Sequence, residues 1–186
     1  MDRSDIQSAT DANRAAWDAS AHLHGQGRDW EALLAAAAQP GFSVLDACIT
    51  ETLKSVGVSG RRAAQVGCNN ARELLSLASL GADPALGIDQ STRFLAQGSM
   101  LAKAAGLNPR LLAANIYDLP EDVGQYDLVL ITIGVLNWMP DLQRFFGIVA
   151  RLMATDAVLV IYETHPFLEV FDPDAARPFE PSASYF

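Results

Sequence analysis

The chain has 186 residues, and 50% of them are hydrophobic, so it is long enough to bury a sizeable core and has the size of one domain. Its 13 Lys and Arg stand against 22 Asp and Glu, and the net charge of -9 would repel a phosphate backbone, so nucleic acid is not an expected partner. Because no apolar run approaches the roughly 20 residues that span a bilayer, no membrane partner is expected either.

The two cysteines, Cys48 and Cys68, lie far apart and belong to no spacing that builds a zinc site, so no metal is expected. The first ten residues are polar and carry acids, whereas a secretory signal needs basic residues followed by an apolar run. These features favour a cytoplasmic protein.

The N-terminal part, residues 1–56, is predicted to be helical. Residues 11–38 have apolar residues at helical spacing and are interrupted at His24–Gly27, which indicates two short helices joined by a turn. A further helix is expected over Val44–Val56.

From residue 61 onward, short apolar runs alternate with longer helical segments, which is typical of βαβ units around a parallel sheet. The expected strands are Arg62–Val66, Ala85–Ile88, Leu111–Asn115, Leu128–Thr132 and Ala157–Tyr162, and the expected crossover helices are Asn70–Ser79, Ser91–Ala105 and Leu142–Met153. The fold class is therefore α/β, with a doubly wound Rossmann-like parallel sheet over residues 61–166. Residues 167–186 are rich in proline, and we expect them to be irregular.

Chemistry is expected first at the turn that follows the first strand. Gln65, Gly67, Cys68, Asn69 and Asn70 leave a buried strand and enter a helix, and such a turn points backbone N–H groups at a ligand. Asp89, followed by Gln90, ends the second strand, where a carboxylate accepts hydrogen bonds from ribose hydroxyls. A dinucleotide site needs two further glycines after Gly67, but Asn69 and Arg72 occupy those places.

The stretch from Arg61 through Phe167 resembles class I S-adenosylmethionine-dependent methyltransferases, in particular a bacterial small-molecule branch with a Val-Gly-Cys-Asn-Asn glycine loop. The resemblance implies that S-adenosylmethionine is the cofactor, S-adenosylhomocysteine the product and a small molecule the methyl acceptor. It also implies that Asn115, Ile116 and Tyr117 hold the adenine and that Thr132 and Ile133 face the methionine part. Residues 1–56 would then form a lid over the cofactor.

The resemblance places the acceptor beside Asn137, Trp138 and Tyr162, with His22 in the lid. Glu163 and His165 follow the fifth strand, so they are the candidate bases for an acceptor that starts protonated. Plainer readings stay open for several of these residues. Asp89 can cap the helix near Ser91, Asn115 can satisfy a strand end, Trp138 can be a core aromatic and His165 can be an exposed loop residue.

Two departures from the family pattern stand out. Ala71 replaces the last glycine of the loop, which would narrow the space beside the first strand or the cofactor. The family also has two more strands than the five expected here. These departures motivate an alternative, a non-catalytic subunit that binds S-adenosylmethionine and is completed by a partner chain. An NAD-dependent oxidoreductase is the second alternative. An exposed fifth strand predicts a homodimer or a covering partner chain.

Overall fold

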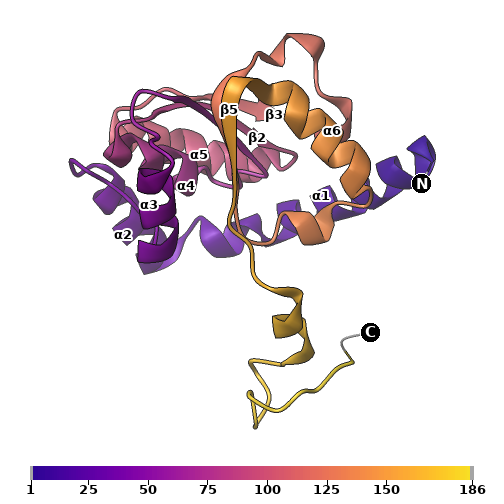
Figure 1. The fold of residues 1–186 in the computed structure, drawn as a ribbon. Coiled ribbons are helices and arrows are strands. Elements are labelled where there is room, and N and C mark those ends of the chain that lie inside the picture. Colours follow the sequence, from indigo (N-terminus) through magenta and orange to yellow (C-terminus); the bar gives the residue numbers. More distant parts are fainter. Residues whose placement is uncertain (1, 185–186) are drawn as a thin grey trace.

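The computed structural model describes residues 2–184, and its centre is a five-stranded parallel sheet in the order β3-β2-β1-β4-β5 (Figure 1). The strands are β1 Arg62–Val66, β2 Asp83–Asp89, β3 Arg110–Ala113, β4 Tyr126–Ile131 and β5 Met153–Ile161. This is the doubly wound arrangement that the sequence predicts. Its strand order reverses between β1 and β4, so a crevice is expected at the carboxyl ends of these strands.

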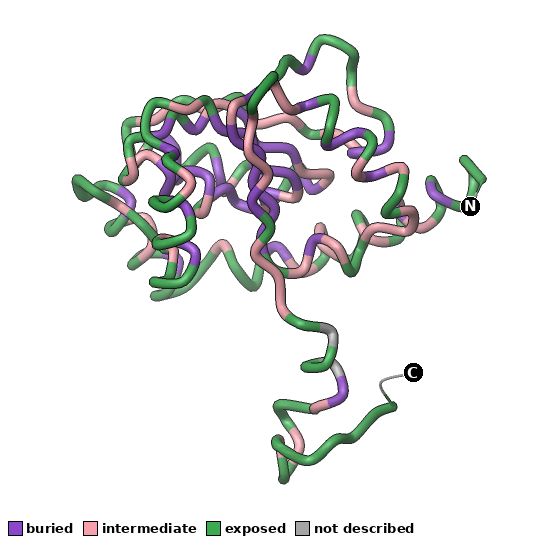
Figure 2. The backbone as a smooth tube through the Cα atoms, in the orientation of Figure 1, coloured by how far each residue is buried: buried purple, intermediate pink, exposed green. Residues whose placement is uncertain are grey.

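Both faces of the sheet are buried, because alternate residues of each central strand enter different cores. Ala64 and Val66 of β1 pack with Phe145 and Val149 of helix α6 (Leu142–Leu152), whereas Ala63 belongs to the core on the other face. On that face the strands pack against helices α3 (Ala47–Ser55), α4 (Arg72–Ser76) and α5 (Thr92–Ala105), and the outer helix α2 (Gly27–Ala37) packs against α5. Figure 2 shows the buried residues concentrated along the central strands.

The N-terminal helices are α1 Arg3–His24, α2 Gly27–Ala37 and α3 Ala47–Ser55. The expectation of two short helices is wrong for the first, which has 22 residues. It begins early because Asp2 and Asp5 form a capping box that satisfies the first backbone N–H groups. Helix α3 begins later than expected because Asp46 caps it by accepting from the Ile49 N–H.

The crossover helices are α4 Arg72–Ser76, α5 Thr92–Ala105 and α6 Leu142–Leu152, and short 3-10 turns follow several strands. The segment expected to be one helix over Asn70–Ser79 is divided into α4 and the 3-10 turn Leu77–Leu80. Its start is displaced because Asn69 and Ala71 have left-handed backbone angles, with φ of 51° and 60°.

The chain leaves the body after β5 and forms an arm that points away from the sheet (Figure 1). A 3-10 turn spans Pro166–Val170, and an antiparallel bridge joins Phe171 to Pro181. Most described residues of this arm are exposed (Figure 2). The segment expected to be irregular thus contains this small local structure over its described part, while residues 185–186 lie outside the described residues.

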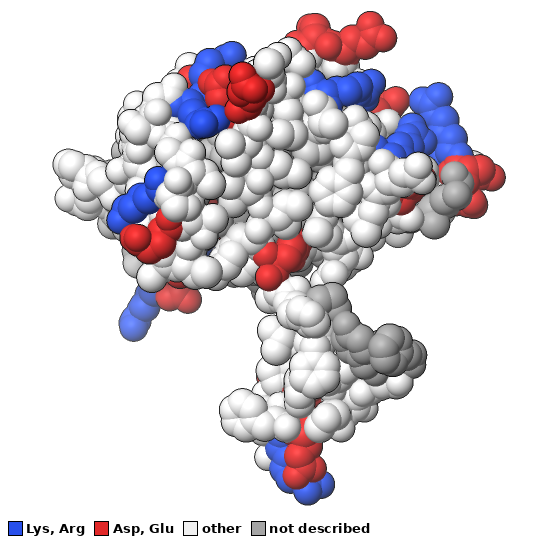
Figure 3. All heavy atoms as spheres, viewed as in Figure 1, with Lys and Arg blue, Asp and Glu red and all other residues white. Residues whose placement is uncertain are grey.

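In the described part of the chain, no helix combines the length and apolar character needed to cross a membrane. On the face drawn in Figure 3, Lys and Arg side chains lie in small groups beside Asp and Glu rather than in a broad basic area.

Candidate functional site

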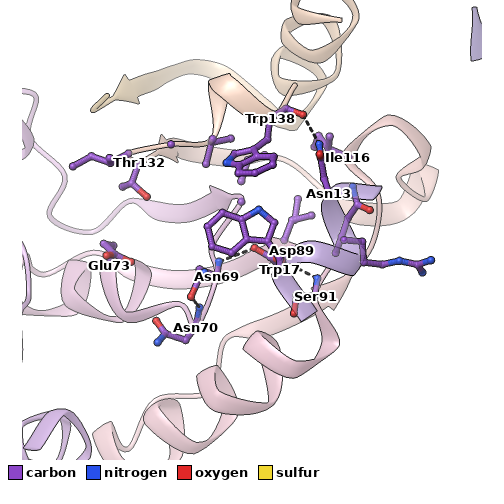
Figure 4. A pocket seen from close by; sticks show the side chains of 18 of the residues that line it. Asn13, Trp17, Asn69, Asn70, Glu73, Asp89, Ser91, Ile116, Thr132 and Trp138 are labelled. Atoms are coloured by element: carbon purple, nitrogen blue, oxygen red, sulfur yellow. Dashed lines mark hydrogen bonds between the residues drawn. The ribbon is translucent and has the colours of Figure 1, made fainter. Parts of the chain in front are cut away.

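A cavity of about 380 Å³ lies where the strand order reverses. Its floor is the carboxyl ends of β1, β2 and β4, and helix α1 covers it (Figure 4). The sequence-predicted residues that line it are Gly67, Asn69, Asn70, Asp89, Gln90, Ile116, Thr132, Ile133 and Trp138. The fold therefore brings nine predicted residues from four separate segments, one at or after the end of each of the first four strands, to one hollow.

The turn after β1 has three consecutive odd positions in left-handed conformation, Gly67, Asn69 and Ala71. Gly67 has no space for a side chain, because a Cβ there would lie 2.6 Å from a methyl group of Val135. Ala71 is fully buried and is absent from the cavity lining, so its methyl group does not narrow the cavity. The departure at Ala71 therefore acts on the backbone of the turn rather than on the ligand space.

Two side chains of the same turn have contrasting positions. Asn70 is only 4% exposed and lines the cavity, and its Oδ1 has no hydrogen-bond partner among the described residues. Cys68 points into the core, where a Cβ on Gly87 would lie 2.8 Å from its Sγ. Burial, reinforced by the nearby Asp89 carboxylate, raises the pKa of the Cys68 thiol well above its usual value, so this thiol stays protonated.

Asp89 joins the first two strand ends. Its Oδ2 accepts from the Asn69 N–H at 2.7 Å and its Oδ1 from the Ser91 N–H at 2.8 Å (Figure 4). Burial raises the pKa of this carboxyl, while the two backbone N–H groups oppose the shift. The alternative that Asp89 caps the following helix is not needed, because Ser91 is the N-cap and its hydroxyl accepts from the Phe94 N–H. Each Asp89 oxygen keeps a further acceptor position.

The segment after β3 contributes Ala114 and Ile116 to the lining, but Asn115 and Tyr117 lie outside it. Asn115 accepts from the Tyr117 N–H at 3.0 Å and donates to Thr10 Oγ1 at 2.9 Å, so it fastens helix α1 to this segment. The Tyr117 hydroxyl donates to the Asp141 carbonyl. Their predicted contact with adenine stays a prediction.

The loop after β4 forms the opposite wall. Thr132 lines the cavity and accepts from Gln65 Nε2 at 2.9 Å, and Gln65 itself is fully buried beneath it. The Glu163 carboxylate accepts from the Gly134 N–H at 2.6 Å and from the Leu136 N–H at 2.9 Å. Glu163 is absent from the lining, so both of its oxygens serve the loop in this structure. A role as base would require the acceptor molecule to reach a remaining lone pair of this carboxylate from outside the lining.

Helix α1 closes the cavity with aromatic and polar contacts. Trp17 and Trp138 meet edge to face, with ring centroids 5.4 Å apart (Figure 4). Asn13 Nδ2 donates to the Trp138 carbonyl at 2.9 Å, and Ser91 Oγ donates to Asp18 Oδ1 at 2.6 Å. Trp138 is 40% exposed, so it is a wall of the cavity rather than a core aromatic.

Other sequence-predicted residues lie outside this cavity. His22 is exposed and contacts the Ala19 carbonyl, Asn137 is exposed, and His165 accepts from the Phe167 N–H in the turn after β5. Tyr162 lines a second hollow, where its hydroxyl donates to Asp46. The roles predicted for these residues in catalysis and acceptor binding stay predictions.

Several lining residues were missed by sequence reasoning, namely Asn13, Arg14, Trp17, Glu73, Ser91 and Met139. Most come from α1 and from the loop after β4. A signal existed for Trp17, since it interrupts a polar stretch, but helical spacing explains it equally well as a core anchor. The position of α1 over the strand ends is not encoded in its own periodicity.

This arrangement defines a Rossmann-like α/β domain whose cavity carries an acidic residue at the end of β2 and a tight turn after β1, which suits a nucleoside-type ligand. Residues 63–156 match the family described as Methyltransferase domain, and this match covers half of the chain. The chain belongs to the methyltransferase domain family. No curated protein matches it.

Solved structures share its fold. A TehB-like S-adenosylmethionine-dependent methyltransferase from Corynebacterium glutamicum has a TM-score of 0.58 at 17% identity, over 77% of this chain and 72% of that one. An S-adenosylmethionine-dependent methyltransferase from Mesorhizobium loti has a TM-score of 0.52 at 22% identity, over 65% of this chain and 56% of that one. Another from Clostridium acetobutylicum has a TM-score of 0.51 at 19% identity, over 61% of this chain and 46% of that one. The chain thus spans about half the length of the last two proteins.

Proposed function

We propose that the chain is an S-adenosylmethionine-dependent methyltransferase that acts on a small molecule. The observation that carries the proposal is one cavity at the carboxyl ends of β1, β2 and β4, lined by the Gly67 turn and Asp89, in a chain of the methyltransferase domain family. A cavity of about 380 Å³ is in the size range of small-molecule sites.

The residues present fit this cofactor. Asp89 has acceptor positions for two ribose hydroxyls, and the unpartnered Asn70 Oδ1 is a buried acceptor that a ligand N–H or O–H would satisfy. Ile116 and Ala114 offer an apolar surface for adenine next to Asp89. Gly67 is a position where a side chain would collide with Val135, so the turn stays close to the ligand space.

When bound, S-adenosylmethionine would supply an activated methyl group, which bonds to the nucleophile of the acceptor as the C–S bond breaks in line and neutral S-adenosylhomocysteine is left. The chain's own residues would then orient the two reactants and exclude water from the cavity. Trp17 and Trp138 close the cavity toward α1, and the loop that carries Trp138 is fixed by Glu163. Aromatic faces next to a sulfonium also offer cation–π stabilisation. His165 and Glu163 remain the candidate bases for an acceptor that starts protonated.

Calorimetric titration with S-adenosylmethionine and S-adenosylhomocysteine tests the proposal. We expect micromolar binding that is lost in Asp89→Ala. Asp127→Ala is the matched control, because Asp127 also accepts a backbone N–H, that of Arg62, but at the opposite end of the sheet. Absence of binding by the folded parent, or a clear micromolar response to NADH instead, would refute the proposal.

A further inference from the structure

A second hollow of about 330 Å³ borders the first, and Arg72, Glu73, Thr132 and Ile133 line both. Its remaining walls come from Val44, Leu45, Asp46, Ile49 and Tyr162. In Figure 4, Glu73 and Thr132 lie at one end of the first cavity and Ile116 at the other. Methyl transfer needs an acceptor in line with the methyl group, so the acceptor has to lie in space that adjoins the cofactor cavity.

One polar pair in this hollow joins the start of α3 to the end of β5. The Tyr162 hydroxyl donates to Asp46 Oδ2, and Asp46 Oδ1 accepts from the Ile49 N–H at 3.1 Å. The bond from Tyr162 lowers the pKa of Asp46, and the same bond raises the pKa of Tyr162. At neutral pH the pair is therefore a carboxylate and a neutral phenol, and the phenol O–H is already engaged as a hydrogen-bond donor to Asp46.

The second carboxylate is Glu73. Its Oε1 accepts from Arg72 Nε at 2.8 Å, and its side chain is 21% exposed. Arg72 is the one cationic side chain among the residues that line this hollow, so its lining has two carboxylates and a single guanidinium, which Glu73 already pairs. The hollow thus has an excess of negative charge and of hydrogen-bond acceptors, beside the apolar side chains of Val44, Leu45, Ile49 and Ile133.

We propose that this second hollow binds the methyl acceptor and selects small amphipathic molecules that carry a protonated amine, which Asp46 and Glu73 hold while the apolar side chains contact the rest of the molecule. This inference rests on the proposed methyltransferase function. A carboxylate or phosphate acceptor would meet two like charges and is selected against. The amine group is the recognition element, and the nucleophile is whichever atom of the acceptor reaches the methyl group.

The test uses the whole chain, labelled with ¹⁵N and saturated with S-adenosylhomocysteine, with benzylammonium and benzoate as probes at equal ionic strength near pH 7. Benzylammonium is expected to shift the amide signals of Asp46, Ile133 and Tyr162 and to bind more tightly than benzoate. Asp46→Asn and Glu73→Gln are each expected to weaken benzylammonium binding about fivefold, the size of one partly exposed ion pair.

Two further variants separate recognition from structure. Glu51→Gln removes the same charge from an exposed position of α3, where Glu51 pairs with Lys54, and should leave the affinity unchanged. Tyr162→Phe removes the hydrogen bond between Tyr162 and Asp46 but keeps the carboxylate, whereas Asp46→Asn removes the charge, so Tyr162→Phe should weaken benzylammonium binding less than Asp46→Asn does. The amide spectrum of each variant reports whether it is folded.

Tighter binding of benzoate, equal loss in Tyr162→Phe and Asp46→Asn, or no shift at these amides would each overturn the inference. A parent chain that fails to bind S-adenosylhomocysteine would instead contradict the proposed function. A parent that binds it without preferring the amine contradicts only the acceptor class.

Discussion

The Asp89 carboxyl is buried between two strand ends, and its raised pKa has consequences of opposite sign for stability and for binding. The ionised form is disfavoured in the folded state, so this group contributes stability that is fully present below the unfolded pKa, near 3.8, and is lost as the pH rises through the raised folded value. Ribose hydroxyls, in contrast, are bound by the ionised form.

We therefore expect the affinity for S-adenosylhomocysteine to fall on acidification at a pH above 3.8, the usual pKa of a free aspartate. Calorimetry across pH 4.5 to 8 measures this dependence. Asp89→Asn should bind more weakly by about 10-fold, the scale of one charge-assisted hydrogen bond, and should lack this titration. A parent affinity that is independent of pH in this range would show that the charge of Asp89 does not contribute to binding.

Gly67 and Ala71 share left-handed backbone angles but differ in what surrounds them. Gly67→Ala should destabilise the fold by about 2–3 kcal/mol, because a left-handed alanine costs about 1–2 kcal/mol and its Cβ also meets Val135. Ala71→Gly relieves the same backbone cost, but it removes a buried methyl group and raises the conformational entropy of the unfolded chain. These effects oppose one another, so we expect the free energy of unfolding to change by less than about 1 kcal/mol.

Urea unfolding of the two variants measures both values, and titration of each with S-adenosylhomocysteine reports on the site. A destabilisation in Gly67→Ala of no more than the about 1–2 kcal/mol of a left-handed alanine would mean that contact with Val135 plays no part. The sequence identifies Gly67 as a turn residue, but it does not distinguish a strained Ala71 from one that obstructs the ligand. That distinction needs the direction in which the methyl group points.

Among the elements, the loop between β4 and α6 depends on a residue from the following strand end. Because Glu163 accepts from two backbone N–H groups of this loop, Glu163→Gln keeps one acceptor oxygen and loses the charge. We expect a loss of about 1–2 kcal/mol in the free energy of unfolding and weaker binding of S-adenosylhomocysteine. Asp127→Asn, at the other end of the sheet, should lower stability without changing the affinity.

Unfolding and titration of both variants check this prediction. If Glu163→Gln instead abolishes methyl transfer while stability and affinity stay at parent values, Glu163 acts as a base rather than as an anchor of the loop. The sequence predicted the correct edge of the sheet for Glu163, because the apolar run of the fifth strand ends just before this polar residue. Its partners are backbone groups of a distant loop, and no side-chain pattern records them.

Strands and crossover helices were predictable because each carries its own apolar periodicity and the connection rules leave few topologies. Helix α1 shows the limit of this reasoning. Its periodicity predicts a helix, but its place over the strand ends depends on tertiary contacts such as Ser91 with Asp18 and Asn13 with Trp138. The resemblance implied a lid from residues 1–56, but Asn13, Arg14 and Trp17 of α1 were not identified as lining residues for this reason.

At the scale of the whole molecule, β5 is an edge strand that, within residues 2–184, pairs only with β4. It spans Met153–Ile161, and Ile161 is 42% exposed, so a long strand presents backbone groups and an apolar side chain on its outer side. Such an edge is a template for pairing with another chain. We expect this chain to form a dimer or larger species as its concentration rises from micromolar to millimolar.

Size-exclusion chromatography with light scattering measures the molar mass of the protein at each concentration. Ile161→Lys should shift the population toward monomer, because a charged side chain on an edge strand opposes pairing. Leu23→Lys adds the same charge at an exposed apolar residue of α1 and should leave the association unchanged. A parent that is monomeric at every concentration would contradict this prediction. The two substitutions change the net charge by the same amount, but only Ile161→Lys changes the edge strand. Equal effects on the measured mass would therefore mean that the chains associate through another surface or that net charge alone controls their association.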